Sequence, residues 1–201
     1  MRQLTATDGN LAAALDRFGE PDFWHRRPGF ATLVLFILEQ QVSLASGAAA
    51  FNRLRARVGK ITPTAVLVPT DIELRQDGFS RQKTRYMREL AHAVLAGRID
   101  LAELESGPDD QVRRELLALI GIGPWTADVY LLSCLRRPDV WPVLDRALQV
   151  ATGEVLGLET VPDPGRLLEL GEQWRPHRST AARIMWHAYL AKRGRSEITF
   201  D

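Results

Sequence analysis

Cysteine is almost absent from this chain, which has one, Cys134, among 201 residues. A single thiol excludes a disulfide framework, and it also excludes an iron–sulfur cluster, which needs four cysteine ligands. Because Cys134 lies among the leucines of segment 131–135, we expect a buried thiol. The four histidines have no metal-ligand spacing such as His-x-x-x-His, and no cofactor motif is present, so we expect neither a catalytic metal nor a cofactor.

Long apolar runs and an excess of charge of one sign are also missing. The longest apolar run, 30–38, falls short of the roughly 20 residues that cross a membrane, and the N-terminus lacks the apolar centre of a signal peptide. We therefore expect a bacterial-type cytoplasmic protein with no membrane partner. The net charge of +1 gives no evidence for nucleic-acid binding, although basic residues gather at 53–60, 81–88 and 174–178. Each cluster is either a binding surface or an ordinary solvated helix face.

Strand patterns are lacking as well, apart from a doubtful one at 65–68, because no other segment alternates apolar and polar residues. Helical periodicity in a chain with 45% apolar and 25% charged residues predicts an all-α globular protein. The expected helices cover 4–18, 30–41, 44–58, 80–95, 111–120, 124–135, 145–156 and 176–192, with shorter ones after 62, 70 and 165. Within the first segment, Thr7 and Asp8 are candidate caps. Between the first two helices, Pro21 and Pro28 bracket a loop with Phe23 and Trp24.

Three residues, Gly121, Ile122 and Gly123, separate two of these helices, which is too few for anything but a tight turn. The sequence therefore predicts a helix-hairpin-helix. Both glycines can adopt positive φ, and Pro124 suits the first position of the second helix. Amides exposed at such a turn form an anion site, for which a nucleic-acid phosphate is the obvious ligand. Taken alone, the triplet is equally compatible with a plain structural turn.

Asp145 follows Gly123 by 22 residues and comes directly after the segment Trp141-Pro142. This acid is our candidate for the chemistry. It is also well placed as an N-cap for the helix that follows, and one aspartate can fill both roles.

The segments LLALIGIGPWTADVYLLS (116–133) and VWPVLDRALQ (140–149) resemble the helix-hairpin-helix (HhH-GPD) superfamily of DNA glycosylases, and more narrowly the 3-methyladenine DNA glycosylase II family. ILEQQVS (37–43), FSRQKTRYMRELA (79–91) and WRPHRSTAARIMW (174–186) resemble that family's wedge segment, mid-domain helix and C-terminal motif. The resemblance runs from about Phe30 to Tyr189.

This resemblance implies a single glycosylase unit over 1–201 without an N-terminal β-domain. One lobe would cover about 30–135, including the hairpin at 111–135, and the second would combine the N-terminal helix with about 136–201. A cleft for DNA and the damaged base would lie between the lobes.

The resemblance also assigns roles to individual residues. Asp145 would stabilise the oxocarbenium character that develops at C1′ as the N-glycosidic bond breaks, and would orient a water. The base pocket would contain Trp125 and Trp186, whose electron-rich rings suit a cationic alkylated purine. The DNA contacts implied are Gly121, Ile122, Gly123, Thr126, Gln41, Arg178 and Ser179, and carbonyls at Gly121 and Gly123 would hold a structural Na⁺ or K⁺.

Several of these residues have plainer interpretations. A tryptophan at helical spacing is usually a core residue, which we expect of Trp141 and Trp174. Gln41 would be the wedge that fills the space of the flipped nucleotide, but Gln40 and Gln41 can equally just end a helix. Val129 stands where some family members carry a pocket tyrosine, and Arg146 stands where others carry an aromatic residue.

The functional expectation is a monofunctional enzyme, because Trp125 stands where bifunctional members carry the lysine that forms a Schiff base. As a monomer it would act on double-stranded DNA that contains damaged bases, release 3-methyladenine or 7-methylguanine and leave an abasic site. Two alternatives stay open. One is a glycosylase for uracil, hypoxanthine or ethenoadenine, and the other is a non-catalytic protein that binds DNA structures.

Overall fold

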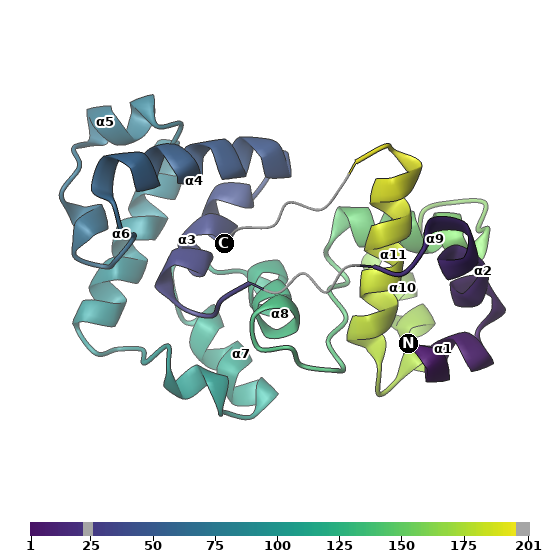
Figure 1. The fold of residues 1–201 in the computed structure, drawn as a ribbon. Helices are drawn as coiled ribbons and strands as arrows, with labels where there is room; N and C mark the ends of the chain where they lie inside the picture. The colour runs from purple at the N-terminus through teal and green to yellow at the C-terminus, as the bar shows by residue number, and fades with distance from the viewer. Residues whose placement is uncertain (22–25, 196–201) are drawn as a thin grey trace. The chain divides into compact units, whose positions relative to one another are not determined.

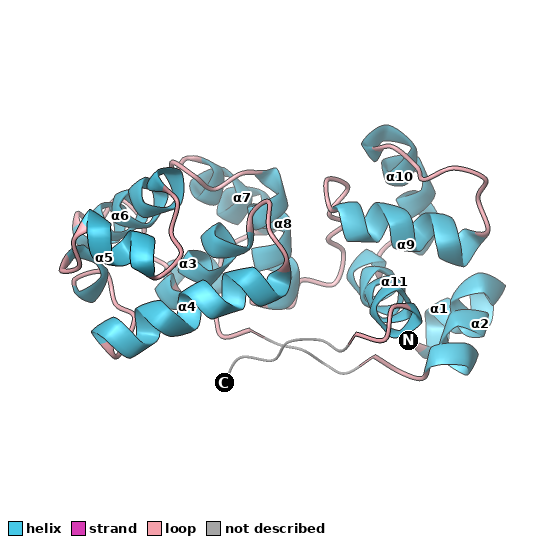
Figure 2. Cartoon of the chain, turned by 90° about the horizontal axis from the view of Figure 1, so that it is seen from above, coloured by secondary structure: helices cyan, strands magenta, loops and turns pink. Residues whose placement is uncertain are grey.

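A computed structural model describes residues 1–21 and 26–195, in which every regular element is a helix (Figures 1 and 2). The all-α prediction is confirmed, and the segment with the doubtful strand pattern is a 3-10 helix, η1 (Ala65–Leu67). Phe23 and Trp24 of the predicted loop lie outside the described residues. None of the described helices is long and apolar enough to span a bilayer.

The chain divides into two compact units. We call residues 26–130 the hairpin unit, and residues 1–25 together with 131–201 the α11 unit. The sequence placed the corresponding boundaries at about 30 and 135. The predicted cleft between lobes stays a prediction.

The hairpin unit is built around α3 (Phe30–Glu39), which packs against α4 (Leu44–Val58) and α6 (Arg81–Leu95) (Figure 1). Every residue of α3 from Leu33 to Glu39 is buried, as expected of a helix that is apolar on all sides. The approach of α4 is close, because a Cβ at Gly47 would lie 2.8 Å from Cγ of Glu39. The remaining elements of this unit are η1, α5 (Asp71–Gln76), η2 (Glu103–Glu105), α7 (Asp109–Leu117) and most of α8 (Pro124–Ser133).

The α11 unit is built around α11 (Arg178–Lys192), which packs against α2 (Gly9–Phe18) and α9 (Arg146–Leu156). Trp141 and Trp174 are core residues, as predicted, with ring centroids 5.1 Å apart. Cys134 is buried, also as predicted. The other elements are α1 (Arg2–Thr7), α10 (Pro164–Gly171) and η3 (Glu172–Trp174).

Asp8, one of the two candidate caps in the segment 4–18, divides this segment into α1 and α2. Its backbone is extended, and its carboxylate accepts the N–H groups of Asn10 at 2.9 Å and Leu11 at 3.1 Å. A short acidic side chain that binds nearby amides favours a new helix start over continuation. The predicted cap at Asp8 is confirmed. The separate helix α1 before it was not predicted, because Leu4 continues the apolar periodicity of α2.

Candidate functional site

The glycine turn joins α7 to α8, and its two glycines differ. Gly121 has φ +92°, and a Cβ there would overlap the ring of Tyr86 from α6, so the fold itself requires glycine. Gly123 does not have a positive φ, so only Gly121 uses the conformational freedom that both glycines have. A Cβ at Gly123 would meet no atom within 4 Å. Close approach of a partner to the backbone would account for glycine at 123.

The amides of the turn are also not equivalent. The N–H of Ile122 donates to the carbonyl of Leu119 at 3.1 Å, so this amide closes the turn. The DNA contact of Ile122 stays a prediction. Ala127 makes the first intrahelical bond of α8, to the carbonyl of Gly123 at 3.0 Å. The N–H groups of Gly123 and Thr126 precede that bond and therefore lie at the positive end of the helix dipole.

The adjacent residues Gln40 and Gln41 differ in their contacts and in their exposure. The Gln40 side chain donates to the carbonyl of Gly121 at 2.9 Å and to Oγ1 of Thr126 at 3.2 Å, so it braces the hairpin. Gln41 is exposed and has φ +57°, a conformation that is uncommon for a residue with a side chain. A residue with a side chain is strained in this conformation, and strained backbone of this kind occurs most often at functional sites. The wedge role of Gln41 stays a prediction, and the bracing role of Gln40 was missed.

The basic start of α6 is partly used inside the hairpin unit. Lys83 donates to the carbonyl of Leu38 at 2.7 Å, and its burial lowers the pKa of its ammonium group. Arg88 pairs with Asp71. Arg81 and Arg85 are exposed, so a DNA-facing role for this cluster depends on these two arginines.

Asp145 and Trp186, which lie 41 residues apart in the sequence, meet in the α11 unit. Asp145 caps α9, and its Oδ1 accepts the N–H of Leu148 at 2.7 Å and the indole Nε1–H of Trp186 at 3.0 Å. The carboxylate is half-buried and the Trp186 side chain is buried. The N-cap interpretation of Asp145 is confirmed, and the second bond fixes the carboxylate against an aromatic ring.

The remaining residues considered for the base pocket, Trp125, Val129 and Arg146, come from both units. Trp125 lies in the first turn of α8 in the hairpin unit and is half-buried, and Val129 on the same helix is buried. Arg146 is exposed and donates to Oε1 of Gln149 at 3.1 Å. Its side chain therefore follows the first turn of α9.

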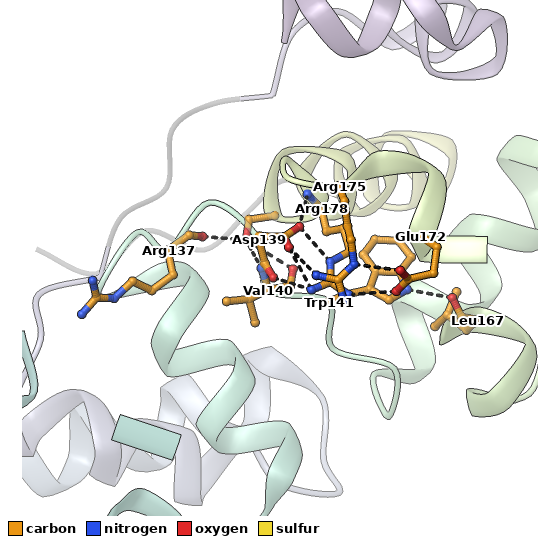
Figure 3. Close-up of polar contacts among 9 residues, drawn as sticks. Arg137, Asp139, Val140, Trp141, Leu167, Glu172, Arg175 and Arg178 are labelled. Carbon is orange, nitrogen blue, oxygen red and sulfur yellow. Dashed lines mark hydrogen bonds and ion pairs between the residues drawn. The ribbon is translucent and has the colours of Figure 1, made fainter. Parts of the chain in front are cut away.

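Arg178 and Ser179 are the first two residues of α11 in the α11 unit, and Figure 3 shows Arg178 beside Asp139. The guanidinium of Arg178 forms a bidentate ion pair with Asp139, in which Nε donates to Oδ1 at 2.8 Å and Nη2 donates to Oδ2 at 3.0 Å. The hydroxyl of Ser179 donates to the carbonyl of Arg137 at 2.6 Å. Their predicted DNA contacts stay predictions, whereas the structure gives both residues a clear internal role. Asp139 was missed, because nothing in a single acid before a Trp-Pro segment indicates its partner.

The pH dependence of stability tests whether the ion pair between Asp139 and Arg178 stabilises the fold. Burial alone would raise the pKa of Asp139, but hydrogen bonds from the Arg178 side chain and backbone, with the charges of Arg178 and Arg175, lower the pKa below its usual value. A carboxylate with a lowered pKa stabilises the folded state above its unfolded pKa of about 3.9, and this contribution is lost as the pH falls through the folded value.

We therefore expect wild type to unfold at higher urea concentration than Asp139→Asn at pH 6, with the difference shrinking below about pH 4. Urea midpoints measured from pH 6 to pH 3 provide the test. Glu169→Gln, which removes the exposed pair with Arg166, should change the midpoint little at any pH. A difference between wild type and Asp139→Asn that stays constant across this range would contradict the assignment.

Comparisons with known proteins give a consistent result. The model of the HhH-GPD superfamily of base excision DNA repair proteins matches residues 34–176. The chain is similar to a DNA-3-methyladenine glycosidase from Bacillus halodurans, with 32% identity, a TM-score of 0.75, and coverage of 92% of this chain and 87% of that one.

Two further solved structures share the fold. A 3-methyladenine DNA glycosylase of Schizosaccharomyces pombe in complex with abasic DNA has a TM-score of 0.83 at 24% identity, with 91% of this chain and 92% of that one covered. An 8-oxoguanine glycosylase/lyase of Clostridium acetobutylicum in complex with double-stranded DNA has a TM-score of 0.79 at 17% identity, with 96% and 69% covered. The chain spans only 40% to 59% of the length of three curated relatives that it matches.

Proposed function

The chain belongs to the HhH-GPD superfamily of base excision DNA repair proteins, and on this premise we propose that it is a DNA glycosylase that hydrolyses the N-glycosidic bond of alkylated purines. Its substrates would be 3-methyladenine and 7-methylguanine in double-stranded DNA, and its product an abasic site. The Bacillus halodurans protein named as a DNA-3-methyladenine glycosidase supports this substrate class.

The contact between Asp145 and Trp186 is the observation that carries the proposal. An enzyme that acts on a base must take it out of the duplex and hold it in a pocket. The indole of Trp186 would provide an aromatic surface that attracts a cationic base, and the carboxylate bound to its Nε1 at 3.0 Å would face the sugar of the same nucleotide. Negative charge at that point stabilises the oxocarbenium character of the transition state.

Alkylated purines suit this arrangement better than neutral bases. The methyl group places a positive charge on the purine, which already weakens the glycosidic bond, so that no strong general acid is needed. The sequence offers no evident acid for the pocket. Hydrolysis would therefore depend mainly on the electrostatic effect of Asp145.

The proposed enzyme forms no Schiff base with the abasic sugar. Lyase chemistry needs an amine that attacks C1′, and Trp125 occupies the position where bifunctional members of the family carry that lysine. We propose a monofunctional hydrolase that works as a monomer in the cytoplasm.

The hairpin would grip the phosphate backbone beside the lesion. The amides of Gly123 and Thr126 at the start of α8 are suited to a phosphate, and backbone contacts of this kind are independent of base sequence. A structural Na⁺ or K⁺ at the hairpin would use carbonyl oxygens there. The carbonyl of Gly121 already accepts the amide of Gln40, which leaves one of its two lone pairs for an ion.

Release of bases from a panel of damaged duplexes tests the proposal. Duplexes that contain 7-methylguanine, 3-methyladenine, hypoxanthine, uracil or ethenoadenine are incubated with excess protein, and the freed bases are quantified by mass spectrometry. We expect release of the two methylated purines and, without heat or alkali, no strand cleavage. Release confined to the other lesions would identify a glycosylase of different specificity. Tight binding to abasic DNA without release of any base would identify the non-catalytic binder. Val129 and Arg146, which stand where other family members carry aromatic residues, would then account for the lack of base release.

A further inference from the structure

The start of α11 depends on an acid from a distant part of the chain. His177 precedes the helix and provides no side-chain cap. Asp139 takes over this role, because its Oδ1 accepts the backbone N–H of Arg178 at 3.3 Å in addition to the guanidinium of the same residue. Nη2 of Arg178 also donates to the backbone carbonyl of Asp139 at 2.9 Å. One arginine thus holds both the side chain and the backbone of Asp139.

Ser179 extends this connection along the loop. Its N–H donates to the carbonyl of Pro138 at 3.0 Å, its hydroxyl donates to the carbonyl of Arg137, and the same hydroxyl accepts the N–H of Val140 at 2.9 Å. The side chain of Ser179 is buried. Four consecutive loop residues, 137–140, are therefore bound by the first two residues of α11.

The next loop residue, Trp141, is anchored on its other side. Its indole N–H donates to the carbonyl of Leu167 at 2.8 Å (Figure 3), and its ring packs against Trp174. Gly171 makes room for the ring, because a Cβ there would lie 2.5 Å from Nε1 of Trp141. The loop then turns tightly, with the N–H of Asp145 bonded to the carbonyl of Pro142 at 2.9 Å.

The far end of the loop returns to the same helix. Trp186 follows Arg178 by eight residues, which corresponds to two turns and a rise of about 12 Å along α11. There its indole meets Asp145. The loop from 137 to 145 is therefore tied to α11 at both ends, first at Arg178 and Ser179 and then at Trp186.

We infer that Asp139, Arg178 and Ser179 are positioning residues, which fix the register of the loop 137–145 along α11 and thereby place the carboxylate of Asp145 at the indole of Trp186. This inference rests on the proposed function, in which Asp145 acts on the sugar. None of the three residues needs to touch the DNA. A displacement of about 1 Å at a reacting group lowers a rate by up to about 100-fold, so loosening the loop should impair base release with little effect on DNA binding.

Two measurements on Asp139→Asn and Ser179→Ala test the inference. The first is the ¹H–¹⁵N signal of the Trp186 indole, assigned among the five tryptophans with a Trp186→Phe variant. The second is the single-turnover rate of 7-methylguanine release at saturating protein, together with the Kd for an abasic duplex. Glu172→Gln is the matched control, because Glu172 belongs to the same ionic cluster through Arg175 and Arg178, and among the residues that the structure describes its side chain makes no hydrogen bond to the loop 137–145.

We expect the indole signal to move in both loop variants, the release rate to fall about 10- to 100-fold, and the Kd to stay within about twofold, with the control unchanged in all three measurements. Circular dichroism shows whether each variant is folded. If Asp139→Asn is unfolded, the test depends on the milder substitution Ser179→Ala. An unmoved indole signal in a folded loop variant overturns the inference, and so does a moved signal with an unchanged rate. If wild type releases no base, the proposed function fails, and the indole signal still decides whether the loop positions Asp145.

Discussion

Asp145→Asn should abolish most base release while leaving the protein folded and able to bind DNA. The expected loss in single-turnover rate is about 100- to 1000-fold, the range seen when one preorganised electrostatic group is removed from a transition state. Asparagine is as good an N-cap as aspartate, and its oxygen can still accept the N–H groups of Leu148 and Trp186. The substitution therefore removes the charge and keeps the geometry.

Asp163→Asn is the matched control for this experiment. Asp163 caps α10 in the same unit, through a bond of 2.8 Å from the N–H of Arg166, and has no role in the proposed chemistry. We expect its release rate and its Kd for abasic DNA to equal those of wild type. Base release by Asp145→Asn at a rate within about threefold of wild type would show that the charge at 145 is dispensable, since loss of a group of this kind costs at least about 100-fold.

Alanine at the two hairpin glycines should have opposite consequences. Gly121→Ala should destabilise the fold by about 2–4 kcal/mol, because φ +92° is unfavourable for alanine and the new methyl group overlaps the Tyr86 ring. Gly123→Ala should leave the free energy of unfolding nearly unchanged, because nothing lies within 4 Å of the new Cβ. It should instead weaken binding to an abasic duplex about 10- to 100-fold, as expected when a charge-assisted hydrogen bond of about 1.5–3 kcal/mol is lost.

Urea unfolding and fluorescence anisotropy measure these two effects, and two glycines serve as controls. Gly59 has φ +72° with no neighbour within 4 Å, so Gly59→Ala isolates the backbone strain from the overlap with Tyr86. Gly9 lies in similarly open space, so Gly9→Ala should not change DNA affinity. Wild-type affinity in Gly123→Ala would mean that DNA does not approach the turn at this residue.

Much of the fold could be predicted because helices are encoded locally. Apolar residues at helical spacing predicted α4 and α6 over nearly their full lengths, and the structure caps these helices with Ser43 and Ser80. The turn at Gly121 was predictable for the same reason, since three residues between two amphipathic segments leave few backbone solutions. The cap at Asp8 was predictable in the same way, but the short helix α1 before it was not predicted, because the apolar stripe continues across the cap and leaves the periodicity intact.

By itself, the sequence determined the all-α class, the hairpin and the identity of Asp145 as a capping acid, because each depends on neighbours within one or two helical turns. The tertiary structure decided the rest: that Gln40 and not Gln41 braces the turn, that Tyr86 makes glycine obligatory at 121 but not at 123, and that Asp139, Arg178 and Ser179 form one network. Those pairings join residues from 35 to 86 positions apart in the chain. A hydrogen bond across such a separation depends on where the chain returns in space, which no local pattern of residue types encodes.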